Sequence, residues 1–337
     1  MMKFGIETET LHLWFQNKRI DVFQFIEKAA EFGYDGVVLN IIEKKNQTEG
    51  LGALGRDDPD HLIREKNLYV ELDTRGTDYQ HLCHVLDIAE LLGAEQVRTF
   101  IMGGTSYSHG NLGGTFNRED LRNGIEELKQ IAPELARRRV RLAVENHELE
   151  TSDDLRWIME EINSPWIGLL YDPGNFMNAW EEPARAARAL SSYIFGTHMK
   201  DNVVCMDGQE PVITGARLGQ GSIDLERVVR ILMENTRLQR MNIELCYPYT
   251  SVFQRPAGAG GSSGPVRAPP GPGGAAQGLL PLRRSAAGGA AGTADGKYEI
   301  CRRIFPEFVS KSGLHEIIRK HAALVLRAFL YKTTKTG

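Results

Sequence analysis

The sequence predicts a single (βα)₈ TIM barrel with a long insertion before its last helix. Short apolar, β-branched runs alternate with helical segments along the chain, and eight such repeats are enough to close a parallel sheet into a barrel. The chain has 337 residues. A typical barrel needs about 250 residues, so the length leaves room for an insertion. An open doubly wound sheet is the alternative, but no G-x-G-x-x-G motif follows the first predicted strand.

The predicted strands are short apolar runs, each about as long as a buried strand of a parallel sheet. They cover residues 2–8, 35–41, 68–74, 96–103, 140–147, 167–173, 193–200 and 241–248.

The predicted helices lie between these strands and carry apolar residues at helical spacing. Several follow Asp or Ser, which cap helix N-termini. The crossover at 44–66 has the weakest helical pattern. The other predicted helices cover residues 21–33, 78–94, 118–139, 152–162, 181–193, 225–235 and 313–332.

Residues 255–296 interrupt the alternation. This stretch has 18 Gly or Pro among 42 residues and no periodicity, so burial cannot offset its ordering entropy. We therefore expect a flexible low-complexity insertion within one catalytic barrel domain made of residues 1–254 and 297–337. A linker to a second domain is the alternative, but the roughly 40 residues beyond it are too few to form one.

Composition restricts the partners and the compartment. The net charge of −4 gives no general attraction to nucleic acid or to an anionic membrane, and no apolar run reaches the length of a membrane span. The N-terminus lacks the cleavable apolar run of a signal peptide. No C-x-x-C pair is present, so we expect reduced thiols and a cytoplasmic protein. The four scattered cysteines are Cys83, Cys205, Cys246 and Cys301.

Ionisable residues at the predicted strand ends carry the chemistry, because barrel active sites lie at the carboxyl ends of the strands. The last four predicted strands each offer one carboxylate or imidazole there, and alternation along the strands lets these groups face one point. A structural ion pair is the alternative for any single member, because an unpaired buried charge is costly. The set consists of Glu145, Asp172, His198 and Glu244.

Three carboxylates and one imidazole favour a hard divalent ion, with Mn²⁺ preferred and Mg²⁺, Co²⁺ or Zn²⁺ possible. Such an ion polarises a sugar carbonyl and acidifies the adjacent C–H, whose proton a carboxylate or His147 could remove. His147 could equally be a histidine that only supports the ligands. Lys200 and Asn175 are candidates for contacts with the substrate, although Asn175 could instead cap a helix. Charged residues at the ends of earlier strands could line the pocket, namely Glu7, Glu9, Asp73 and Arg98.

These residues resemble the xylose-isomerase-like TIM-barrel superfamily of sugar isomerases and epimerases. The resemblance covers nearly the whole chain apart from 255–296, and it implies that the four residues bind the metal while Glu145 and Glu244 also form the acid–base pair of a cis-enediolate mechanism. The matching segments are AVENH (143–147), GLLYDPGN (168–175), GTHMKD (196–201), LGQGSIDL (218–225) and NIEL (242–245).

Two departures argue against plain ketose epimerisation. Asn175 stands where ketose 3-epimerases usually carry a His, and Val204 stands where they carry an Arg. The segment GIETETL (5–11), the Glu145-Asn146-His147 run and the long stretch before the last helix look like the α subunit of C-glycoside deglycosidases. That resemblance implies elimination of the aglycone from a 3-oxo-glycoside, with His147 as the base, and a small β subunit as partner.

Several functions remain open at this point. The sequence favours proton abstraction α to a keto-sugar carbonyl through a metal-bound enediolate, followed by elimination of the aglycone or neighbouring group, as in a lyase. A sugar or sugar phosphate isomerase or epimerase is the alternative. Metal-dependent hydrolysis and a non-catalytic sugar-binding or assembly subunit are further alternatives. We expect a small sugar or glycoside substrate and an oligomer, whose contact could involve exposed Trp14, Phe15 and Trp180.

Overall fold

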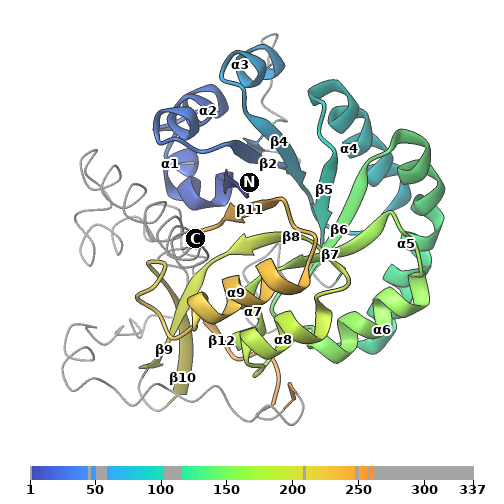
Figure 1. Ribbon diagram of the computed structural model, residues 1–337, viewed down its shortest axis with the longest axis vertical. Coiled ribbons are helices and arrows are strands. Elements are labelled where there is room, and N and C mark those ends of the chain that lie inside the picture. Colours follow the sequence, from blue (N-terminus) through green and yellow to red (C-terminus); the bar gives the residue numbers. More distant parts are fainter. Residues whose placement is uncertain are drawn as a thin grey trace, which may run out of the picture.

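Eight parallel strands form a closed ring in the computed structural model of the protein (Figure 1). The structure describes residues 2–44, 47–50, 59–101, 116–207, 210–246, 250–256 and 259–260. The first strand, β1 (Lys3–Glu7), pairs with both the second and the last strand of the ring, and this pairing closes the barrel. The remaining strands of the ring are, in spatial order, β2 (Gly36–Lys44), β4 (Tyr69–Asp73), β5 (Gln96–Thr99), β6 (Arg141–Glu145), β7 (Ile167–Tyr171), β8 (Ile194–Met199) and β11 (Arg240–Ile243).

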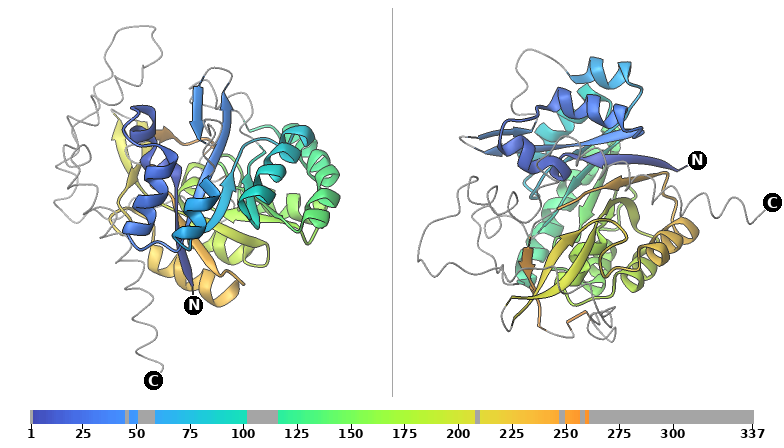
Figure 2. Two further views of the ribbon diagram at one scale, coloured as in Figure 1. Left: turned by 90° about the horizontal axis from the view of Figure 1, so that it is seen from above. Right: turned by 90° about the vertical axis from the view of Figure 1, so that its left-hand side faces the viewer.

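The helices lie around the outside of the ring (Figures 1 and 2). Their caps follow the sequence: Asp21 and Thr151 form capping boxes that satisfy the first backbone N–H groups of their helices. The helices that cover the barrel are α2 (Val22–Glu31), α3 (Pro59–Glu65), α4 (Tyr79–Leu92), α5 (Arg118–Arg138), α6 (Ser152–Ile162), α8 (Pro183–Leu190) and α9 (Leu225–Asn235).

The predicted (βα)₈ barrel is confirmed, with differences in its details. Several strands end before their predicted limits; β5 ends at Thr99 and β6 at Glu145. The sequence placed Glu244 within the last strand, but in the structure it lies one residue after β11 ends. The weakly helical crossover contains a short strand, β3 (Gln47–Gly50), antiparallel to β2, before α3 begins. Each difference lies at the carboxyl end of the barrel, where strand pairing gives way to loops.

Three features were not predicted. A 3-10 helix, η1 (Thr8–Leu11), and α1 (His12–Gln16) follow β1 directly, and α7 (Pro173–Asn178) follows β7. After β8, the chain forms a separate antiparallel sheet of three strands, which stands beside the ring in Figure 1. Its strands are β9 (Asp201–Asp207), β10 (Glu210–Ala216) and β12 (Thr250–Val252).

The amino-terminal end of the barrel interior is filled by a hydrogen-bonded polar network. Glu71 Oε2 accepts from Asn242 Nδ2 at 2.8 Å and from Gln96 Nε2 at 3.2 Å. Tyr69 donates to Asn242 Oδ1 at 2.7 Å, and its ring lies so close to Gly36 that a Cβ there would clash. These residues bond mainly to one another, and the cluster of candidate ligands lies at the opposite end of the barrel.

The aromatic residues that we expected to be exposed are partly buried. Trp14 and Phe15 pack against the hydrophobic core, and the rings of Phe15 and Phe25 lie 5.8 Å apart. Trp180 stacks on Phe253, with ring centroids 3.8 Å apart. The expectation of full exposure was wrong, because intramolecular contacts leave these side chains half-buried. An oligomer contact through them stays a prediction.

The predicted insertion at 255–296 lies outside the described residues except for 255–256 and 259–260, and the predicted helix at 313–332 lies outside them entirely. The first residue of the predicted insertion is packed and not flexible: Arg255 donates to Leu149 O at 3.0 Å and its guanidinium lies over the Phe116 ring. No helix in the described part of the chain is both long and apolar enough to cross a membrane. Cys83 and Cys246, whose side chains are described, carry free thiols.

Candidate metal centre

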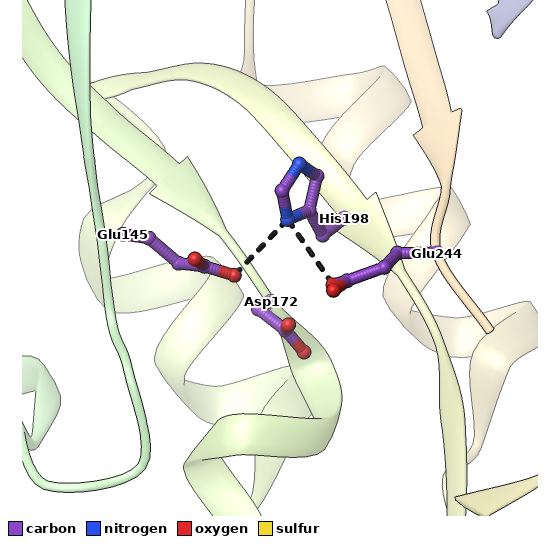
Figure 3. Close-up of side chains that lie close together, drawn as sticks. All are labelled: Glu145, Asp172, His198 and Glu244. Carbon is purple, nitrogen blue, oxygen red and sulfur yellow. Dashed lines mark hydrogen bonds and ion pairs between the residues drawn. The ribbon is translucent and has the colours of Figure 1, made fainter. Parts of the chain in front are cut away.

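Four buried side chains meet at the carboxyl ends of four neighbouring strands (Figure 3). Glu145 ends β6, Asp172 follows β7, His198 lies near the end of β8, and Glu244 follows β11. One ligand atom from each lies within 4.8 Å of those of the others. The exposed fraction is 0% for the first three side chains and 6% for Glu244. The structure therefore brings together all four residues that the sequence singled out as ligands.

The two carboxylate oxygens of Asp172 have different partners. Oδ1 caps helix α7 by accepting from Gly174 N at 2.8 Å and Asn175 N at 3.2 Å. Pro173 occupies the first position of this helix, where a missing N–H costs nothing. Because the cap holds Oδ1, only Oδ2 is turned towards the cluster.

Asp73 and the cluster hold the imidazole of His198 between them. Nδ1 lies 3.1 Å from Glu145 Oε1 and 3.1 Å from Glu244 Oε2, as the dashed lines in Figure 3 show. Nε2 lies 3.3 Å from Asp73 Oδ2 on the opposite side of the ring. A carboxylate behind the far nitrogen is the usual arrangement for a histidine that binds a metal, because it fixes the ring orientation and raises its basicity.

Arg98 holds the second oxygen of Glu145. Its guanidinium forms a buried ion pair with Glu145 Oε2 and donates to Thr74 O at 3.1 Å. Burial alone would raise the pKa of Glu145, but Arg98 and His198 outweigh it and hold that pKa below its usual range. Glu145 is therefore ionised, with Oε1 facing the cluster.

Lys200 adds a positive charge to the cluster. Its Nζ lies 2.7 Å from Asp172 Oδ2 and 2.8 Å from Glu244 Oε2, and 3.5 Å from Cys246 Sγ. Burial opposes ionisation of Glu244, yet Lys200 and His198 keep its pKa well below the usual range. Lys200, which we predicted to contact the substrate, thus forms ion pairs with two of the candidate ligands.

The donor set fits a divalent metal ion. Three buried carboxylates packed so closely repel one another unless cations compensate them. One buried oxygen on each of Glu145, Asp172 and Glu244 lacks a hydrogen bond of good geometry, and its short contact is an ion pair with Arg98 or Lys200. Hard oxygen ligands with one imidazole suit Mn²⁺, Mg²⁺ or Zn²⁺. These four residues could hold such an ion.

His147 and Asn175 lie beside the cluster. The His147 ring stacks on Phe100, with centroids 4.1 Å apart, and burial with Arg98 and Lys200 nearby lowers its pKa to about 3. His147 is therefore neutral at pH 7. Asn175 Nδ2 lies 3.4 Å from Glu145 Oε1, so Asn175 does more than occupy the first turn of α7.

Two earlier-strand residues matter more to the site than the sequence indicated. Asp73 and Arg98 contact candidate ligands directly, whereas the sequence indicated only that they could line the pocket. Glu7 is buried nearby, and burial together with Asp73 and Glu244 raises its pKa. Glu9 is half exposed and does not join the cluster. In the sequence, Asp73 and Arg98 could be recognised only as charged residues at the ends of strands. Closure of the ring is what places them opposite His198 and Glu145.

A comparison with models of known protein families shows which family this chain belongs to. The family model described as "Xylose isomerase-like TIM barrel" matches residues 26–268, which is more than half of the chain. The chain belongs to this family. The resemblance expected from the sequence motifs is thereby confirmed.

Curated relatives in the family are distant. The chain is 25% identical over 186 residues to 3-oxo-isoapionate decarboxylase of Pectobacterium atrosepticum, covering 54% of this chain and 63% of the relative. It is 27% identical over 137 residues to inosose dehydratase of Clostridium botulinum, covering 36% and 45%. The matches span less than two thirds of the length of these relatives.

Solved structures of the xylose isomerase-like TIM barrel share the fold. The IOLI protein, solved with a zinc atom, superposes with a TM-score of 0.57 at 16% identity, covering 73% of this chain and 90% of that one. A Mycobacterium smegmatis family member in complex with magnesium superposes with a TM-score of 0.56 at 15% identity, covering 74% and 90%. At these identities the likeness shows the fold alone.

Proposed function

We propose that this protein is a divalent-metal-dependent enzyme that removes a proton α to the carbonyl of a keto-sugar and then eliminates the aglycone or a neighbouring group from a 3-oxo-glycoside. The single observation that carries this proposal is the buried meeting of Glu145, Asp172, His198 and Glu244 at four neighbouring strand ends. A bound ion would supply Lewis acidity to a carbonyl and its neighbouring hydroxyl. We favour Mn²⁺ as that ion.

The side chains around the cluster divide the proton transfers. Glu145 is kept ionised by Arg98, so it can accept a proton. Glu244 is also ionised and approaches the same point from β11. One of the two carboxylates would take the proton from the substrate C–H as the base and, once protonated, would return it as the acid to the leaving group or to the carbon. His147 is neutral and stacks on Phe100 beside the cluster, so it could serve as the base that the resemblance implies, but its lowered pKa makes it a weaker base than an ordinary histidine. Lys200 and Asn175 then contact substrate oxygens.

The curated relatives support elimination more than isomerisation. A decarboxylase of a 3-oxo compound and a dehydratase both break a bond to a group leaving the substrate. A sugar isomerase or epimerase remains the second candidate; L-ribulose 3-epimerase shares the fold, with a TM-score of 0.55 at 16% identity over 72% of this chain and 81% of that one. Both outcomes share the first proton abstraction.

The proposal is tested by proton exchange. With Mn²⁺ present in D₂O, the wild type should incorporate deuterium into a free ketose or release the aglycone of a 3-oxo-glycoside, with products followed by mass. Glu145→Gln and Glu244→Gln should lose exchange by at least about a hundredfold, because general acid–base groups contribute that much. Glu126→Gln, an exposed carboxylate on α5, is the matched control and should be unaffected.

The outcomes separate the candidates. Release of the leaving group identifies a lyase, and a product that differs in mass from the substrate only by the incorporated deuterium identifies an isomerase or epimerase. Hydrolysis without deuterium uptake would contradict proton abstraction. Absence of bound divalent ion, together with indifference to chelators, would instead favour a non-catalytic sugar-binding or assembly subunit. Copurification of a small second chain would support the β subunit that the resemblance implies.

A further inference from the structure

Lys200 is held in one position between two candidate ligands. Its ammonium contacts Asp172 Oδ2 at 2.7 Å and Glu244 Oε2 at 2.8 Å, and the side chain is only 8% exposed. The stem passes directly over Gly174 in the first turn of α7: a Cβ on Gly174 would meet Lys200 Cγ at 2.6 Å. The glycine therefore makes room for the lysine, and the backbone of α7 fixes the path of its stem.

The oxygens that Lys200 contacts are the ones an ion would need. The other oxygen of Asp172, Oδ1, is used by the α7 cap, so Oδ2 is the atom that this residue can offer. Glu244 Oε2 also lies 3.1 Å from His198 Nδ1, at the centre of the cluster, whereas Oε1 faces the Cys246 thiol at 3.4 Å. One ammonium thus contacts the ligand atoms of two of the four residues.

We propose that the Lys200 ammonium and a divalent cation compete for Asp172 Oδ2 and Glu244 Oε2, so that Lys200 sets how tightly the cluster holds its ion. This inference rests on the proposed function, because it takes the cluster to be a metal site. Two cations that share the same oxygens repel one another across a few ångströms of protein with little water between them. The ion must therefore displace the ammonium or share the oxygens with it, and either arrangement weakens metal binding.

The test is the metal affinity of Lys200→Met, measured by calorimetry with Mn²⁺ and with Mg²⁺ in the absence of substrate. Methionine keeps the length and bulk of the stem but removes the charge. We expect binding about tenfold tighter or more than in the wild type, because a like charge is removed at close range. Lys200→Arg keeps the charge and should bind no more tightly than the wild type. Lys129→Met, an exposed lysine on α5, controls for net charge.

Thermal unfolding provides a second readout. Lys200→Met leaves Asp172 and Glu244 without their shared counterion, so its melting temperature should fall in chelator and rise more on addition of Mn²⁺ than that of the wild type. If this variant does not fold in chelator, it should be purified with Mn²⁺, and the concentration of chelator needed to strip the ion should exceed that for the wild type. Lys200→Gln should change the affinity in the same direction.

Unchanged or weaker metal binding in Lys200→Met, with the wild type still binding, would overturn the inference and leave the proposed function standing. A role confined to substrate contact predicts that result. A wild type that binds neither ion would overturn both the inference and the proposed metal site. The two failures are therefore distinguishable in a single set of titrations.

Discussion

Asp73 is a positioning residue for His198. Its Oδ2 lies 3.3 Å from Nε2, and both side chains are buried. Asp73→Asn keeps the shape but removes the charge that orients the ring, so metal affinity should fall by about 10–100-fold. Titration calorimetry with Mn²⁺ measures this, with Asp153→Asn on the surface of α6 as the control. An unchanged affinity would mean that the protein backbone alone orients the imidazole.

At the residue scale, the sequence was sufficient for some groups and not for others. Glu145, Asp172, His198 and Glu244 could be selected because each is a metal-binding residue type at the end of a predicted strand. Asp73 and Arg98 carry the same signal, but their partners come from strands more than 40 positions away along the chain. Which residues lie opposite Asp73 and Arg98 depends on the register of the closed sheet, and no local sequence pattern encodes that register.

At the element scale, the loop between β6 and α6 contains two buried carboxyls, Glu148 and Glu150, of which Glu150 is the more deeply buried. It accepts from His147 N at 3.0 Å, and burial raises its pKa from an ordinary 4.5 to about 7. The folded protein therefore binds this proton more tightly than the unfolded chain does. Its contribution to stability is fully present below pH 4.5 and is lost as the pH rises through about 7.

Glu150→Gln should remove this pH dependence. Relative to the variant, the wild type should lose about 3 kcal/mol of unfolding free energy between acidic and alkaline pH, as a pKa shift of this size implies. Urea unfolding of both proteins at a series of pH values from 4 to about 8.5 measures the difference. If the difference in unfolding free energy between the two proteins were constant across the series, Glu150 would have an ordinary pKa in the folded protein. If the wild type instead gained stability relative to the variant as the pH rises, the pKa of Glu150 would be lowered and not raised.

The elements that escaped prediction share a physical cause. The sheet of β9, β10 and β12 joins residues on both sides of α9 and β11, so its pairing depends on contacts distant in the sequence. Its position is set partly by Asp201, which accepts from the backbone N–H groups of Gly219 and Gly221, both at 2.8 Å. Helix α7 is too short for its apolar spacing to be recognised. The longer helices were predicted because several turns of periodicity and a cap coincide.

At the scale of the whole molecule, the barrel was predictable because eight similar repeats leave few ways to bury a parallel sheet. Closure itself is a tertiary event: β1 must pair with β11, more than 230 residues later. The candidate ligands depend on that closure, because Glu244 follows β11 and the other three follow or end strands β6, β7 and β8. The centre therefore links four neighbouring strands of the ring.

A bound ion should accordingly stabilise the entire barrel against unfolding. The unfolded chain scatters the four ligands, so it binds the ion weakly, and a free ion concentration 100 times the Kd should add about 2.7 kcal/mol to the unfolding free energy. For a domain of this size that corresponds to a rise in melting temperature of roughly 4–5 °C. Scanning calorimetry with Mn²⁺ and then with excess chelator measures the rise and its reversal.

The His198→Ala variant should lose this stabilisation by Mn²⁺, because the site then lacks its one nitrogen ligand. If the His198→Ala protein were stabilised by Mn²⁺ as much as the wild type, the ion would be binding elsewhere, and the four strand ends would not form its site.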